Sequence, residues 1–169
     1  MDQLTIPPCE AWPANPPRRN LYIADDIAAH PMASLVMAQS WKGAPPIYLC
    51  TGWEILAYED KYLACKLEAD GVKVVFEEYE GMPHCFAMML RNAPSTPRCY
   101  RGWASFISAV VENPENIKSS AVMIKSKSGK EVPLKFDELS EASEEDFRQR
   151  VLHKTGLEDS ERDIPMAKL

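Results

Sequence analysis

The 169-residue sequence has no long apolar run, no basic stripe and no segment resembling a signal peptide. A membrane-spanning helix needs about 20 consecutive apolar residues, so no membrane span is predicted. Proteins that bind nucleic acids contact phosphates through clustered Lys and Arg, and the net charge of -6 argues against that class. The amino terminus lacks the basic segment and apolar core of an export signal, which predicts a cytoplasmic location.

Cys-x-x-Cys spacing is also missing. The five cysteines are scattered along the chain: Cys9, Cys50, Cys65, Cys85 and Cys99. An odd number without metal-ligand spacing favours free thiols over a disulfide framework or a zinc site, and no cofactor or metal is predicted. Cys85 adjoins His84, but successive side chains on an extended segment point to opposite faces, which argues against a thiol–imidazole pair.

Residue composition and sequence pattern divide the chain into three predicted segments. Residues 1–45 form a proline-rich extended segment, since eight of the 14 prolines precede Ile47. Residues 46–113 form an α/β domain. Residues 114–169 form an appended β-hairpin, a helix and a frayed tail from residue 156 onward.

The middle segment carries a strand–helix–strand pattern. A continuous apolar run over 46–51 predicts a buried strand, 59–70 an amphipathic helix ending at Gly71, and 72–78 a second strand. This pattern is typical of a βαβ crossover in a parallel sheet. Residues 100–112 then predict an amphipathic helix whose apolar stripe belongs to the core.

Two strands over 120–125 and 131–136 predict a hairpin, in which Pro133 marks an edge strand. A last helix is predicted to begin at Ser140 or Ser143 and to run to about Lys154. Shorter helical pieces are predicted near residues 25–29 and 33–41.

The candidate catalytic residues follow the two strands of the βαβ unit. Glu54 comes three residues after the first strand, and His84 lies on the loop after the second. Open α/β sheets keep their active sites at the carboxyl ends of strands. A carboxylate there can hold an imidazole in one tautomer and stabilise its cation. A lone histidine is, however, more often a structural loop residue.

Segments 45–56 and 70–86, together with the His-Pro-Met-Ala-Ser-Leu run at 30–35, resemble the hormone-sensitive-lipase-like serine esterases, an α/β-hydrolase family. The Cys-Glu-Ala-Trp-Pro run at 9–13 resembles a fungal branch of it. The resemblance implies that His84 is the triad histidine and that Glu54, in a Gly-x-Glu-x-Leu pattern, is the triad acid. Glu59 and Asp60 are interpreted as acids at the positive end of the following helix.

No Gly-x-Ser-x-Gly elbow and no His-Gly-Gly oxyanion loop occurs in these 169 residues, so the nucleophilic serine is absent. The resemblance therefore implies the C-terminal part of an α/β-hydrolase parallel sheet, inactive toward esters by itself. A small-molecule ester would be the substrate if an N-terminal half, or a separate chain, completed the site. Without that completion, an exposed sheet edge would favour self-association of the chain. The alternative is a non-catalytic binding module derived from a hydrolase.

Overall fold

The computed structural model describes residues 9–10, 23–24 and 27–155. These residues fall into two compact units, of which the second, Ser40–Glu141, contains the sheet and both candidate residues. The first unit combines residues before Ser40 with residues after Glu141. Each unit is described by itself below.

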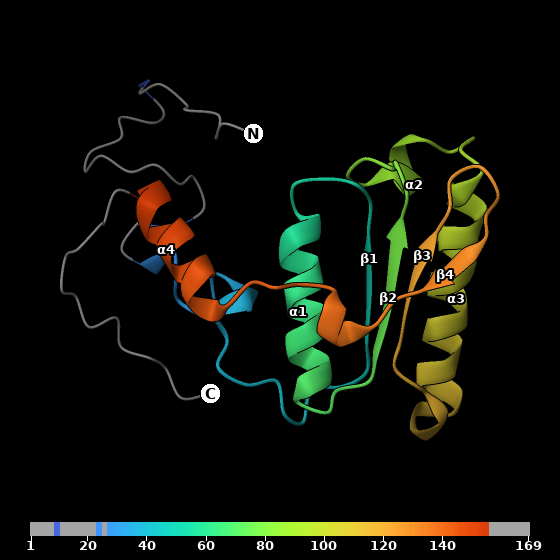
Figure 1. The fold of residues 1–169 in the computed structure, drawn as a ribbon, viewed down its shortest axis with the longest axis horizontal. Coiled ribbons are helices and arrows are strands. Elements are labelled where there is room, and N and C mark those ends of the chain that lie inside the picture. Colours follow the sequence, from blue (N-terminus) through green and yellow to red (C-terminus); the bar gives the residue numbers. More distant parts are fainter. Residues whose placement is uncertain (1–8, 11–22, 25–26, 156–169) are drawn as a thin grey trace. The chain divides into compact units, whose positions relative to one another are not determined.

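A four-stranded sheet forms the centre of the second unit (Figure 1). Its strands are β1 (Ile47–Thr51), β2 (Val74–Tyr79), β3 (Ser120–Ile124) and β4 (Glu131–Pro133), and they lie in this order across the sheet. β1, β2 and β3 are parallel, whereas β4 is antiparallel to β3. The predicted α/β class is thus confirmed as a mostly parallel sheet with helices.

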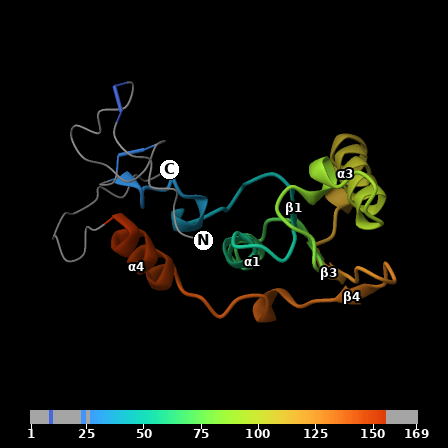
Figure 2. The same cartoon turned by 90° about the horizontal axis from the view of Figure 1, so that it is seen from above.

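Helices cover both faces of this sheet, as Figure 2 shows from above. On one face, α1 (Ala57–Ala69) buries Ala64 and Leu67 against Val74 and Phe76 of β2. On the other face, α2 (Phe86–Met89) and α3 (Ser95–Glu112) pack with Tyr79 and Ile124. Because side chains alternate along a strand, each buried strand supplies apolar residues to both layers.

The βαβ unit has the predicted order, with small shifts at its ends. Gly71 ends α1 in the left-handed conformation, with φ of 83°, as the sequence predicted. The two strands of the βαβ unit pair in parallel, with Thr51 opposite Glu78, so their carboxyl ends lie side by side. This register is what brings the loops after β1 and β2 together.

The prediction for α3 was wrong in two respects. The helix begins at Ser95, five residues before the predicted start, because Pro97 lies in the first turn, where a missing N–H costs no helical hydrogen bond. The stripe predicted to be core is also partly exposed: Ile107 is 61% and Val111 78% exposed. We call the exposed residues Tyr100, Trp103, Ile107 and Val111 the α3 stripe.

The predicted hairpin is present, and Pro133 lies on edge strand β4, as expected for a residue without an N–H. Its first strand also pairs with β2, so the hairpin continues the main sheet rather than standing apart from it. Two short 3-10 turns, η3 (Pro114–Asn116) and η4 (Phe136–Glu138), flank the hairpin.

In the first unit, α4 (Glu144–Thr155) begins after Ser143, one of the two predicted caps. The Ser143 hydroxyl accepts the Asp146 N–H at 3.2 Å, and the Asp146 carboxylate accepts the Ser143 N–H at 2.7 Å. This reciprocal pair is a capping box. The helix predicted over 33–41 is reduced to one 3-10 turn, η2 (Leu35–Met37).

Several predictions lie outside the described residues: about half of the proline-rich segment, part of the turn at 25–29, and the tail from 156. Among the helices that the structure describes, none has the length and apolar character needed to cross a bilayer.

Candidate active site

The candidate site lies where the loops after β1 and β2 meet. Gly52 makes this meeting possible: a Cβ atom built on it would lie 1.9 Å from the carbonyl oxygen of Met82. The next residue, Trp53, donates its N–H to that same carbonyl at 2.8 Å. Only glycine allows so close an approach between the two backbones. Gly52 therefore fixes the distance between the loop of Glu54 and the loop of His84.

Glu54 and His84, predicted as a pair from the sequence, are in direct contact. His84 Nδ1 lies 2.5 Å from Glu54 Oε2. The Glu54 side chain is 13% exposed and that of His84 62% exposed. With Nδ1 facing the carboxylate, His84 Nε2 makes no hydrogen bond to any residue that the structure describes. The carboxylate can thus fix the tautomer that leaves Nε2 able to accept a proton.

A hydroxyl and a second carboxylate surround this pair. Buried Thr51, the last residue of β1, donates its hydroxyl to Glu54 Oε1 at 3.4 Å. Asp60 on α1 lines the same pocket as Thr51 and Glu54. Burial raises the pKa of Asp60 above its usual value, and the negative charge of Glu54 raises it further. Asp60 is thus a second, partly buried acid beside the pair rather than only a helix-end charge.

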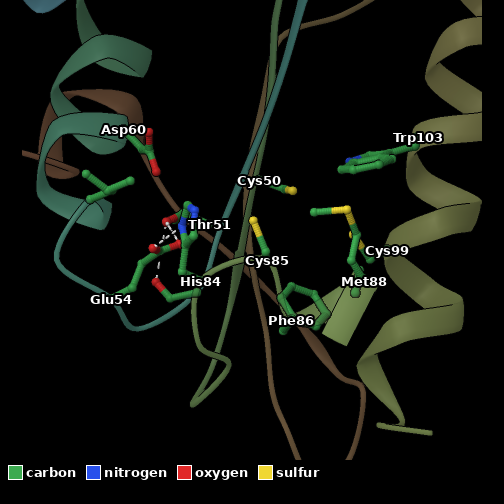
Figure 3. A pocket seen from close by; sticks show the side chains of 13 residues that line it. Cys50, Thr51, Glu54, Asp60, His84, Cys85, Phe86, Met88, Cys99 and Trp103 are labelled. Carbon is green, nitrogen blue, oxygen red and sulfur yellow. Dashed lines mark hydrogen bonds and ion pairs between the residues drawn. The ribbon is translucent and has the colours of Figure 1, made fainter. Parts of the chain in front are cut away.

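A pocket of about 260 Å³ opens beside these residues. Figure 3 shows its two parts: oxygen and nitrogen atoms of Asp60, Thr51, Glu54 and His84 gather on one side, and sulfur and apolar side chains on the other. The second part is lined by Cys50, Cys85, Phe86, Met88, Cys99 and Trp103. A polar dyad next to an apolar wall is an arrangement that can hold a small molecule with one reactive polar group.

Residues 16–88 match the alpha/beta hydrolase fold family. The matched segment contains β1, α1 and β2, and includes both Glu54 and His84. It covers less than half of the 169 residues. No curated protein and no solved structure matched the chain. The mostly parallel sheet with helices on both faces is consistent with part of an α/β-hydrolase fold.

The loop after His84 turns tightly at Cys85, the residue before α2. Cys85 has φ of 53°, and it is the only described residue other than glycine with a positive φ. Its carbonyl accepts the Met88 N–H at 3.0 Å, which starts α2. A non-glycine residue in this region is strained, and such strain concentrates at functional sites.

The sheet also contains a buried charge network around Glu77 of β2, which is 4% exposed. Its carboxylate accepts the hydroxyls of Tyr48 and Tyr79 at 2.5 Å each and the guanidinium of Arg98 at 2.8 Å. Burial and the adjacent carboxylate raise the pKa of both tyrosines well above its usual value. Gly102 of α3 leaves room for this network, because a Cβ there would lie 2.7 Å from the Tyr48 hydroxyl.

No serine is among the described residues that line the pocket. Among the described residues, no three His, Cys, Asp or Glu side chains gather in a way that could hold a metal ion. Sequence reasoning missed Thr51 and Cys50, for which the only signal was their place at the end of β1. It also interpreted Asp60 as a helix-end charge, although Asp60 lies two helical turns before the buried Leu67, on the same side of α1.

Proposed function

We propose that Glu54 and His84 are the acid and base of a carboxylic-ester hydrolase of the serine type. The observation that supports this most directly is the 2.5 Å contact between Glu54 Oε2 and His84 Nδ1 at the carboxyl ends of two parallel strands. The family match over residues 16–88 supports the same reaction class. The resemblance to the hormone-sensitive-lipase-like group, and to its fungal branch, is part of this proposal.

In the proposed reaction, His84 Nδ1–H donates to Glu54 and Nε2 takes the proton of a serine hydroxyl as that serine attacks the ester carbonyl. Glu54 stabilises the imidazolium that forms. His84 then gives the proton to the leaving alcohol, and later activates the water that releases the acid. The apolar wall around Phe86 and Met88 would contact the apolar part of the ester.

The serine must come from polypeptide outside these 169 residues, since they contain no Gly-x-Ser-x-Gly. β1 is the place where it would attach. Among the described strands, β1 has a neighbour on one side only. An apolar groove of about 370 Å³ runs beside it, between Tyr48 and Leu49 of β1 and Trp103, Phe106 and Ile107 of α3. A further strand of the fold would pair with β1 and bury the α3 stripe.

Complementation tests the proposal. The chain is co-expressed with a polypeptide that carries the serine elbow of this fold, and hydrolysis of a small activated ester is measured. We expect activity that is lost in His84→Ala and falls by about 10³ to 10⁴ in Glu54→Gln, because the wrong tautomer is then no longer prevented. His153→Ala on α4, outside the site, is the matched control and should keep full activity.

The chain alone should not hydrolyse the ester. Turnover above background that disappears in His84→Ala would contradict the need for an external serine. Complemented activity that is indifferent to both Glu54 and His84 would contradict the assigned roles.

The exposed α3 stripe also supports a second candidate, a non-catalytic module that binds an apolar segment of another protein. The two candidates differ in the state of the isolated chain. An incomplete hydrolase should self-associate through β1 and the stripe, whereas a binding module should unfold cooperatively as a monomer. Sedimentation velocity combined with thermal unfolding separates them. Ile107→Glu should abolish self-association, and Ser108→Glu, on the neighbouring exposed position, should leave it unchanged.

A further inference from the structure

Two cysteines from distant parts of the sequence meet in the sulfur-rich part of the pocket (Figure 3). Cys50 is the fourth residue of β1, and Cys99 lies in the second turn of α3. Cys99 belongs to the packed cluster on this face of the sheet, and Cys50 packs against that cluster. Cys99 is completely buried, whereas Cys50 is partly exposed. The pair therefore joins the edge strand to the helix that covers it.

The surroundings give the two thiols different chemistry. The neighbouring Cys99 thiol is the largest cause that lowers the pKa of Cys50; burial opposes it, and the Trp103 indole N–H lowers the pKa further. The neighbouring Cys50, together with burial, raises the pKa of Cys99. Cys50 is accordingly the thiol that is favoured as thiolate, and Cys99 is the one that retains its proton.

Access to this pair is through the pocket. Both cysteines line its wall, and its volume of about 260 Å³ admits a molecule as small as hydrogen peroxide. A thiol whose pKa is lowered, that is reachable from solvent and that lies near a second thiol is the arrangement found in redox-sensing cysteines. Cys65 differs, because it donates to the Phe136 carbonyl at 2.9 Å on the opposite face of the sheet.

We propose that Cys50 and Cys99 form a redox modification site, in which a small hydroperoxide converts the two thiols into a disulfide between β1 and α3. The Cys50 thiolate attacks the O–O bond, giving a sulfenic acid on Cys50 and releasing an alcohol, or water from hydrogen peroxide. The Cys99 sulfur then attacks the sulfenic sulfur, the S–O bond breaks, and water leaves. The dithiol loses two electrons, which reduce the hydroperoxide. This site does not depend on the proposed ester hydrolysis.

The sequence allows a direct test, because trypsin places each of the five cysteines on a separate peptide. Cys50 falls on 43–61, Cys99 on 99–101, Cys65 on 62–66, Cys85 on 74–91 and Cys9 on 1–18. The reduced chain is treated with hydrogen peroxide under native conditions, remaining thiols are blocked with iodoacetamide, and the digest is analysed by mass spectrometry. We expect peptide 43–61 linked to 99–101, and an intact mass lighter by two hydrogens.

Variants and an unfolded control make the result specific. The link should disappear in Cys50→Ser and in Cys99→Ser, and persist in the controls Cys65→Ser and Cys85→Ser. In concentrated urea the same treatment should give scrambled pairs, because the native geometry is lost. Absence of the 43–61/99–101 link in the folded wild-type chain would overturn the proposal. So would a dominant link through Cys85, which lines the same pocket, or equal yields in urea and native buffer.

Discussion

Gly52→Ala is the sharpest test of how the site is built. The added Cβ would lie 1.9 Å from the Met82 carbonyl oxygen and 2.7 Å from its carbonyl carbon, so the two backbones must move apart. A backbone clash cannot be relieved by rotating a side chain. The movement also stretches the hydrogen bond from Trp53 N–H to Met82 O, which is 2.8 Å long.

The expected loss follows from these two contributions. Overpacking in a tightly packed region costs about 1 to 3 kcal/mol. A lost backbone hydrogen bond adds about 1 kcal/mol. Together they predict a decrease in the free energy of unfolding of about 2 to 4 kcal/mol. Because the same movement separates Glu54 from His84, complemented esterase activity should fall as well.

Urea unfolding followed by circular dichroism measures the stability change, and Gly129→Ala is the control. Gly129 also lies in a loop, but an added Cβ has open space around it, and its φ of 64° leaves only backbone strain of about 1 kcal/mol. Gly129→Ala should keep activity in the complementation assay. If Gly52→Ala is no less stable than Gly129→Ala, the close approach of the two loops is not what positions Glu54.

Two further predictions concern buried charges. Glu77→Gln should lower the free energy of unfolding by about 3 to 5 kcal/mol, since it leaves the partly buried Arg98 without its main buried partner. Urea unfolding measures this change, and a loss below about 1 kcal/mol would contradict the prediction. Asp60→Asn should raise the melting temperature near neutral pH, because burial raises the folded-state pKa of Asp60 and its charge therefore costs stability above that pKa. The gain should vanish as the pH falls below about 4, where the carboxyl is protonated in both states, and exposed Glu59→Gln should show no comparable gain.

The candidate dyad could be predicted from the sequence because it depends on local pattern and general topology. Two apolar strands separated by a helical segment indicate a parallel pair, and residues just past their ends must then lie close together. This reasoning is enough to predict that Glu54 and His84 are neighbours. It does not predict the side chains around them, because the rotation of α1 places Asp60 and the pleat of β1 places Thr51, and a residue pattern fixes neither.

The fold was predicted less completely where distant segments meet. The hairpin was readable from its turn and from Pro133, but its pairing with β2 depends on how α3 returns the chain across the sheet. The meeting of Cys50 with Cys99 depends on the same return. The α3 stripe shows a different limit: its periodicity predicts an apolar face, and whether that face is covered depends on polypeptide outside the residues that produce the pattern.

The unpaired side of β1 and the α3 stripe border the pocket that contains His84. Cys50 and Trp103 line both the pocket next to His84 and the groove beside β1. A strand that paired with β1 would therefore end beside the His84 imidazole, which is where a nucleophile is needed. The same strand would cover Cys50. Completion of the site and oxidation of the Cys50–Cys99 pair therefore compete for one surface, so a completed assembly should be the form in which Cys50 is shielded from peroxide.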